Sequence, residues 1–149
     1  MSAGEYCNRD VIIVERSESI RVAVDLMRNQ HVGDVVVVDK ENSSTKPIGI
    51  LTDRDIVLEI LAEDVDLDAV AVGDVMSYEV VTVGEETKLM DAIKQMRTKS
   101  VRRLPVVDKD GGLVGILSAD DVVQLLSEQL SDLAALIAKE ISKETKSRP

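Results

Sequence analysis

The sequence predicts an α+β fold in which two copies of one β-α-β-β-α unit pack about a pseudo-twofold axis. The main observation is an internal repeat, because a repeat fixes the architecture before any single motif is weighed. At a shift of 69 residues, GEYCNRDVIIV from Gly4 aligns with GDVMSYEVVTV from Gly73, and VVDK at 37–40 recurs at 106–109. At a shift of 66, GILTDRDIV at 49–57 aligns with GILSADDVV at 115–123, because the polar turn at 41–46 is three residues longer than its counterpart at 110–112.

Both copies show the same order of elements. Short β-branched runs predict a first strand, and apolar residues at helical spacing predict an amphipathic helix after it. Two more strands and a second helix complete each unit. In the first copy these elements are expected at 11–14, 20–27, 35–38, 48–51 and from Asp53; in the second they are expected at 80–83, 89–96, 104–107, 113–117 and from Ala119.

These elements divide the chain into three parts. We assign residues 1–66 to the first unit, 67–129 to the second, and 130–149 to a C-terminal helical extension and tail. The strand VVVV at 35–38 is apolar throughout, which is typical of a strand buried on both faces. The two units are therefore expected to pack against each other.

Composition excludes several classes of function. A net charge of -10 disfavours binding to nucleic-acid backbones, and no apolar run approaches the roughly 18 residues of a membrane span. One cysteine, Cys7, and one histidine, His31, cannot form an internal disulfide or a Cys/His metal cluster. No catalytic triad or glycine-rich phosphate loop can be assembled, so we expect no enzyme. The N-terminus lacks a signal-peptide pattern, which predicts a cytoplasmic protein.

The repeated segments resemble a known family. The order of elements, the VVD turns and the GILTDRD and GILSADD segments are similar to a tandem pair of CBS (cystathionine beta-synthase) domains, or Bateman module, over residues 4–129. The resemblance implies two clefts related by the pseudo-twofold axis, a regulatory rather than catalytic role, and homodimers. It also implies an adenine ligand: AMP, ADP or ATP, with NAD and S-adenosylmethionine as further candidates.

Each copy has a hydroxyl residue followed three positions later by an aspartate. Thr52 and Asp55 fit a helix capping box, as do Ser118 and Asp121, and capping alone is a sufficient reason for this pattern. The resemblance implies a second role, in which the hydroxyl contacts phosphate and the aspartate contacts ribose. With no aromatic side chain available to stack on adenine, the apolar wall beside Thr52 is expected from Ile12 and Val36, and that beside Ser118 from Val81.

Two arginines make the clefts unequal. The resemblance implies that Arg102 and Arg103 point to the phosphate bound by Thr52, although adjacent arginines at a strand start are also typical of a solvated edge. The corresponding residues of the first copy are Gly33 and Asp34, which offer no cation. The Thr52 cleft is therefore expected to bind nucleotide, and the Ser118 cleft to bind it more weakly.

The last helix outruns its counterpart in the first copy. Leu130, Leu133, Ile137 and Ile141 form an apolar stripe that needs a surface to cover it, either on its own domain or across a dimer.

The sequence leaves two functions open. One is a ligand sensor that acts on an unknown protein partner; the other is a scaffold protein with empty clefts, in which the capping boxes only cap.

Overall fold

Each copy of the repeat forms a three-stranded sheet with the same strand order in the computed structural model, which describes residues 1–41, 43–78 and 80–147. In each sheet the first strand is parallel to the second, and the second is antiparallel to the third. The strands are β1 (Ile13–Glu15), β2 (Asp34–Glu41) and β3 (Ser44–Thr52) in the first sheet, and β4 (Val83–Gly84), β5 (Arg103–Val107) and β6 (Leu113–Ser118) in the second. The predicted fold class and order of elements are confirmed.

The repeat extends to irregularities of the backbone. The β2–β3 ladder shifts register between Val37 and Val38, and the β5–β6 ladder shifts between Val106 and Val107, which are the equivalent positions. Residues 35–38 are completely buried, as the apolar run predicted. Position 42 of the predicted polar turn lies outside the described residues.

One amphipathic helix covers each sheet. Helices α2 (Ile20–Gln30) and α4 (Leu89–Lys99) have equal lengths, and both end at a residue with left-handed backbone, His31 and Ser100. Their buried faces come from residues spaced three and four apart: Ile20, Ala23 and Met27 in α2, and Leu89, Ala92 and Met96 in α4. The first core lies between α2 and the first sheet, and the second between α4 and the second sheet.

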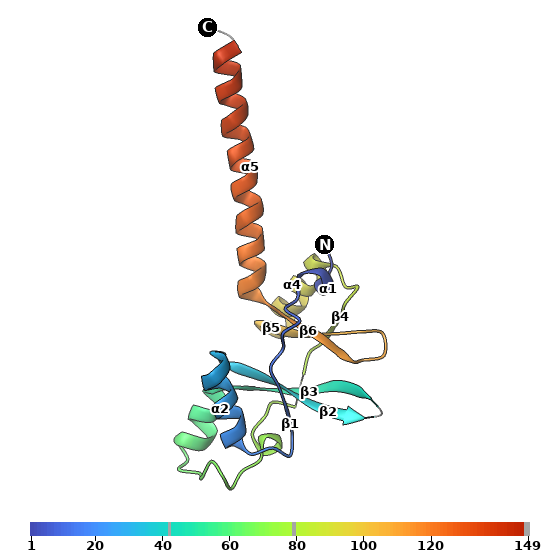
Figure 1. Cartoon of the computed structure of the whole chain (residues 1–149), viewed down its shortest axis with the longest axis vertical. Coiled ribbons are helices and arrows are strands. Elements are labelled where there is room, and N and C mark those ends of the chain that lie inside the picture. Colours follow the sequence, from blue (N-terminus) through green and yellow to red (C-terminus); the bar gives the residue numbers. More distant parts are fainter. Residues whose placement is uncertain (42, 79, 148–149) are drawn as a thin grey trace.

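The segment that leads into each unit packs on the other unit. Helix α1 (Ala3–Tyr6) belongs to the second core, since the amide of Ala3 donates to the Thr87 carbonyl at 2.8 Å. The 3-10 turn η2 (Val72–Asp74) belongs to the first core, with the Val72 amide donating to the Glu18 carbonyl at 2.8 Å. The chain therefore crosses between the units twice, as Figure 1 shows for the blue and green-yellow segments.

The crossings replace part of the predicted strands. Residues 80–82 and 11–12 were expected in strands but lie outside them, because β4 begins only at Val83 and β1 at Ile13. Instead, single bridges hold the crossing segments: Asn8 pairs with Ile116 in β6, and Ser77 pairs with Ile50 in β3. The crossing is tight at Gly49, where an added Cβ would lie 2.5 Å from the Ser77 carbonyl oxygen.

The helices that follow β3 and β6 differ most between the copies. After β3, the single turn α3 (Asp53–Ile56) continues into a π-helix, η1 (Val57–Leu61). After β6, α5 (Ala119–Ser147) runs for 29 residues and extends away from both sheets (Figure 1). None of the helices in the described ranges has the length and apolarity that a membrane span requires.

Candidate functional site

The cleft next to Thr52, called here the Thr52 cleft, lies where the end of β3 meets the start of β5. Its volume is about 460 Å³, within the range of roughly 300–1,000 Å³ typical of small-molecule sites. Four of the predicted residues, Thr52, Asp55, Arg102 and Arg103, line it together, with the first two from one unit and the last two from the other. The remaining lining residues are Ile50, Arg54, Ser77, Val80, Val81, Ser100 and Val101.

Thr52 and Asp55 form the predicted capping box. The Asp55 amide donates to Thr52 Oγ1 at 3.1 Å, and the Thr52 amide donates to Asp55 Oδ2 at 3.0 Å. Asp55 Oδ1 has no protein partner within the described part of the chain. One carboxylate oxygen thus caps the helix while the other is available to accept a hydrogen bond from a ligand, so capping and binding do not compete for the same atom.

Both arginines of the Thr52 cleft are ion-paired in this structure. Arg103 Nε lies 2.5 Å from Asp34 Oδ2, and an Arg102 guanidinium nitrogen lies 2.6 Å from Asp120 Oδ1. The Arg102 pair is exposed on both sides, whereas the Asp34 side chain is only 13% exposed. Asp34 and Arg103 occupy equivalent positions in the two copies. The pseudo-twofold axis brings these two residues face to face, so their ion pair joins the units.

The surroundings of Asp34 oppose its negative charge. Burial raises the pKa of the Asp34 carboxyl, and nearby Asp53 raises it further, while the positive charge of Arg103 acts in the opposite direction. The two carboxylates are close because the Asp53 amide donates to the Gly33 carbonyl at 2.9 Å, which holds the start of α3 against the start of β2. The positive charge of Arg103 therefore stabilises the negative charge of the Asp34 carboxylate against burial and the repulsion of Asp53.

The second cleft, called the Ser118 cleft, has a volume of about 320 Å³ and is strongly acidic. Four carboxylates line it, from Asp10, Asp34, Asp120 and Asp121. Ser118 caps the Asp121 amide at 3.1 Å, without a described return bond from the Ser118 amide to Asp121. The expectation that this cleft has no cation is corrected, because Arg103 lines both clefts while paired with Asp34.

The apolar walls are exchanged relative to the sequence prediction. Ile12, expected beside Thr52, lines the Ser118 cleft, and Val81, expected beside Ser118, lines the Thr52 cleft. The physical reason is the crossing of the lead-in segments, which carries each of them to the other unit's third strand. Val36 lines neither cleft, because it is completely buried in the middle of β2.

Sequence reasoning also missed lining residues of the Thr52 cleft. Arg54 adds a third guanidinium and lies inside the GILTDRD segment, so its position was available as a signal. Ser77 and Ser100 add hydroxyl groups to the lining. Ser77 reaches the cleft only through the crossing, which no local pattern shows.

Comparison with known proteins identifies the family. A family model described as CBS domain matches residues 3–62 and again residues 72–128. The chain belongs to the CBS domain family. It is a CBS domain pair, and the two matches contain the two sheets described above.

Relatives and solved structures agree with this assignment. The CBS pair is 38% identical over 125 residues to an uncharacterized protein of Methanopyrus kandleri, covering 84% of this chain but only 62% of that relative. Its fold is similar to that of a CBS domain pair solved with 5'-methylthioadenosine and S-adenosyl-L-methionine (TM-score 0.74, 22% identity, 87% and 98% of the two chains covered). It is also similar to the cytosolic domain of the Mg²⁺ channel MgtE, solved with ATP (TM-score 0.70, 25% identity, 83% and 48% covered).

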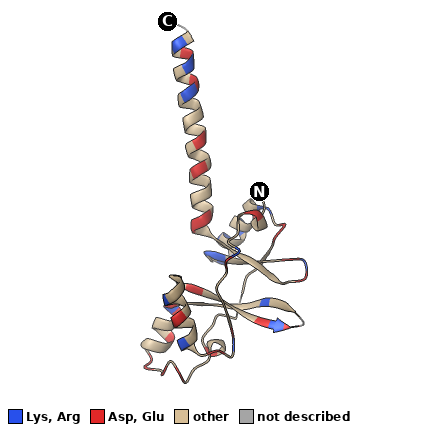
Figure 2. Cartoon of the chain, viewed as in Figure 1, with Lys and Arg blue, Asp and Glu red and all other residues tan. Residues whose placement is uncertain are grey.

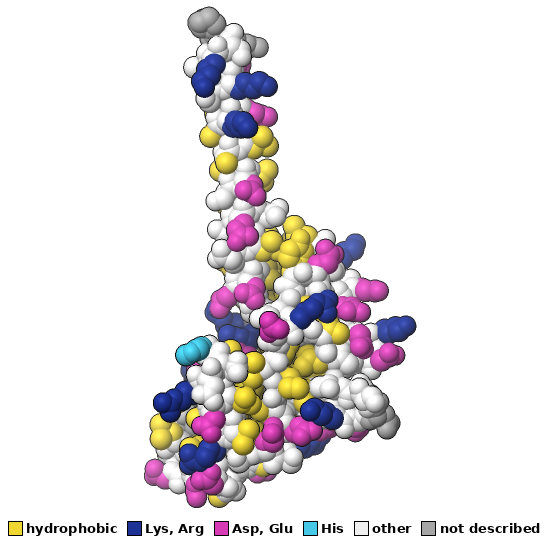
Figure 3. Space-filling view, viewed as in Figure 1, with side chains coloured by type: hydrophobic (Ala, Val, Ile, Leu, Met, Phe, Trp, Pro, Cys, Tyr) yellow, Lys and Arg dark blue, Asp and Glu magenta, His cyan; other side chains and the backbone are white. Residues whose placement is uncertain are grey.

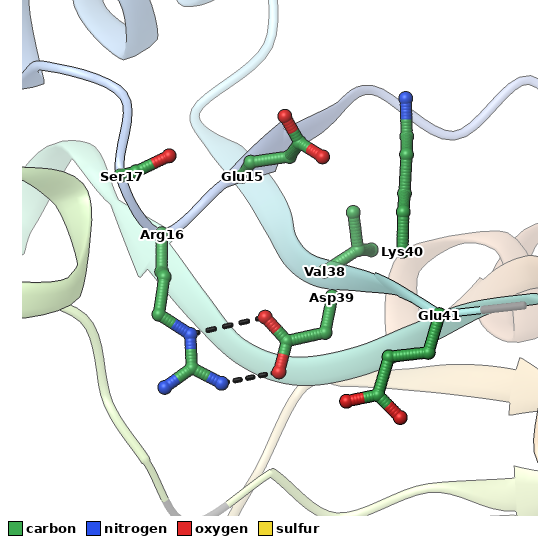
Figure 4. A pocket seen from close by; sticks show the side chains of 7 residues that line it. All are labelled: Glu15, Arg16, Ser17, Val38, Asp39, Lys40 and Glu41. Atoms are coloured by element: carbon green, nitrogen blue, oxygen red, sulfur yellow. Dashed lines mark hydrogen bonds and ion pairs between the residues drawn. The ribbon is translucent and has the colours of Figure 1, made fainter.

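A third hollow of this CBS pair, of about 370 Å³, lies at the edge of the first sheet and is of a different kind (Figure 4). Its walls are mostly charged, and Arg16 holds Asp39 through two parallel contacts. Lys40 points away from this pair. Val38 is the one apolar side chain in the lining. The hollow therefore lacks the aliphatic wall that an adenine ring requires.

Proposed function

We propose that this CBS domain pair is a regulatory module that binds an adenine nucleotide in the Thr52 cleft and catalyses no reaction. The observation that carries the proposal is the composition of that cleft. A carboxylate with an unused oxygen, three arginines and an aliphatic wall line one cavity of about 460 Å³. Each group matches one part of a nucleotide: ribose, phosphate and base. The ATP complex of the similar MgtE domain supports this ligand class.

The geometry supports one orientation of the ligand. The adenine ring lies against Ile50, Val80 and Val81, because the described residues of the lining include no aromatic side chain for stacking. The ribose hydroxyls donate to Asp55 Oδ1. The phosphates face the second unit, where Arg102 and Arg103 make charge-assisted hydrogen bonds. Such a ligand contacts both units at once, and this contact is the physical basis of a regulatory response.

Charge favours the Thr52 cleft over the Ser118 cleft. Among the described residues that line them, the Ser118 cleft has four carboxylates against one arginine, whereas the Thr52 cleft has one carboxylate against three arginines. A phosphate group is attracted to the second arrangement and repelled by the first. We therefore propose one nucleotide for each chain, of the AMP, ADP or ATP type.

Isothermal titration calorimetry with AMP, ADP, ATP, NAD, S-adenosylmethionine and adenosine tests the proposal. We expect one site per chain, with phosphorylated ligands binding more tightly than adenosine. Two equal sites would contradict the assignment to the Thr52 cleft.

The alternative is a scaffold protein that works through its surfaces. It is favoured by the ion pairs of Arg102 and Arg103, which satisfy both cations without a ligand. If none of the six adenine compounds binds, the scaffold function stands and the capping boxes serve only to start helices.

A further inference from the structure

Beyond its first two turns, α5 exposes a continuous apolar stripe. Val122 is buried in the second core, and Leu126, Leu130, Leu133, Ile137 and Ile141 follow it at spacings of four, four, three, four and four, which places them on one helix face. The five side chains after Val122 are between 44% and 69% exposed. Figure 3 shows hydrophobic side chains on the surface of this helix, and Figure 1 shows that the helix stands clear of both sheets. Packing on its own domain, one of the two expectations for this stripe, is therefore wrong.

We propose that this stripe pairs with the same stripe of a second copy, with the two α5 helices antiparallel. The spacing is self-complementary, as a twofold interface requires. When Leu130 is placed opposite Ile137 of the partner subunit, Leu126 falls opposite Ile141 of the partner subunit. The twofold axis then passes beside Leu133, and every residue of the stripe meets apolar surface.

The position of the domain selects the antiparallel sense. The stripe lies on the face of α5 that continues from Val122, which packs onto the second unit. In a parallel pair, the globular parts of both copies would lie at the same end of the paired helices. Both would need the space on the stripe side of α5, which the second unit of the first copy already occupies. In an antiparallel pair, only the C-terminal end of the partner's α5 lies beside the second unit of the first copy. The two globular parts then lie at opposite ends of the paired helices.

The charge distribution favours the same sense. Residues 119–133 contain four acids and no base, whereas all three lysines of the helix follow residue 138, as Figure 2 shows along its length. The helix carries six acids and three lysines, a net charge of 3 − 6 = −3, so the rest of the −10 chain carries −7. Antiparallel pairing sets the lysine-containing end of one helix beside the acidic half of the other. It also separates the two acidic globular parts.

Cysteine cross-linking tests the sense of the pairing. Leu126→Cys and Ile141→Cys are each introduced into a chain whose only cysteine is removed by Cys7→Ser. Mild oxidation of an equimolar mixture of the two variants should give a covalent heterodimer, while Leu126→Cys alone should give almost none. A homodimer of Leu126→Cys that forms as fast as the mixed product would overturn the antiparallel arrangement.

A matched pair of substitutions tests the pairing itself. Leu133→Glu places a charge in the stripe and should shift the light-scattering mass toward the monomer value of 16.3 kDa. Ala135→Glu adds the same charge on the opposite helix face and should keep twice that mass. Both sites are exposed, so the thermal unfolding of the two domains should be unchanged in each variant. Equal masses for the two variants, whether monomeric or dimeric, would overturn the proposal and leave the stripe to a different protein or to no partner.

Discussion

Replacing Asp34 by asparagine should tighten the binding of a phosphorylated ligand about fivefold and leave adenosine unaffected. In the free protein, Arg103 is held by Asp34 at 2.5 Å, although its guanidinium also lines the Thr52 cleft. A phosphate group in that cleft must compete with the carboxylate for the same cation. The Asp34→Asn variant keeps the size of the side chain and removes its charge, so the competition is weakened.

The magnitude follows from the exposure of the pair. Exposed ion pairs contribute about 0.2–1 kcal/mol. With Asp34 only 13% exposed and Arg103 38% exposed, the upper end of this range applies, and about 1 kcal/mol corresponds to a factor of about five in ligand affinity.

The same competition reduces the effect of Arg103→Ala on ligand affinity. A charge-assisted hydrogen bond contributes about 1.5–3 kcal/mol, and subtracting the lost ion pair leaves about 0.5–2 kcal/mol, or roughly a 2- to 30-fold loss.

Titration calorimetry with AMP, ATP and adenosine measures these effects, and Asp39→Asn is the control. Asp39 is also ion-paired to an arginine, Arg16, but it lies in the hollow of Figure 4 and does not line the Thr52 cleft. The control makes the same change of charge and should leave AMP affinity unchanged. Weaker or equal AMP binding by Asp34→Asn would refute the competition, and would mean that Asp34 orients Arg103 for the ligand instead.

Three more predictions follow from the same geometry. Asp55→Ala should weaken AMP and adenosine alike and lower stability by about 1 kcal/mol through the lost capping box, whereas Asp121→Ala should do much less; equal losses in titration and thermal unfolding would contradict the inequality of the clefts. Gly49→Ala should destabilise the fold by about 1–3 kcal/mol in urea unfolding, because its Cβ would meet the Ser77 carbonyl, while Gly84→Ala, with its nearest atom at 3.6 Å, should be tolerated. The raised pKa of Asp34 means that its contribution to stability is present below the unfolded value of about 3.9 and is lost as pH rises through the higher folded value, so Asp34→Asn should gain stability relative to the parent as the pH of the unfolding measurement rises above about 4; a difference independent of pH would exclude this.

Most of the fold could be predicted because its signals are local and occur twice. The helices α2 and α4 have strong three-and-four spacing, and their buried residues occupy the same three positions of two helices of equal length. The capping box at Thr52 needs only two residues three apart, so the pattern was visible in the sequence, and both of its hydrogen bonds form. Each of these features depends on residues within one or two helical turns of one another.

The apolar walls of the clefts could not be predicted in this way. Ile12 reaches its cleft through the backbone pairing of Asn8 with Ile116, and Val81 reaches its cleft through the pairing of Ser77 with Ile50. Both pairings join a lead-in segment to a strand of the other unit, far outside the range of a local sequence pattern. The β-branched residues at 11–12 and 80–82 favour extended backbone, but they lie outside the strands β1 and β4. Propensity describes the local conformation and says nothing about which sheet a segment will meet.

The pairing of Asp34 with Arg103 contains information that the repeat itself offered. Residues close to a twofold axis face their own equivalents, so two aligned positions with opposite charges are candidates for a contact between the units. The sequence prediction assigned Arg103 to the Thr52 cleft and Asp34 to the Ser118 cleft, and it expected no contact between them. The structure shows that they are partners, which is why Arg103 lines both clefts.

This shared arginine connects binding to the contact between the units. Asp34 belongs to the first unit and Arg103 to the second, so their ion pair is one of the bonds that hold the units together. In the binding mode proposed above, a phosphate that pairs with Arg103 breaks that ion pair, and a nucleotide that also binds Asp55 replaces it with a new link between the same two units. In the same binding mode, adenosine binds Asp55 without disturbing the ion pair. The phosphate is therefore the part of the ligand that changes how the units are joined, and a regulatory response in this protein should depend on phosphate more than on adenine.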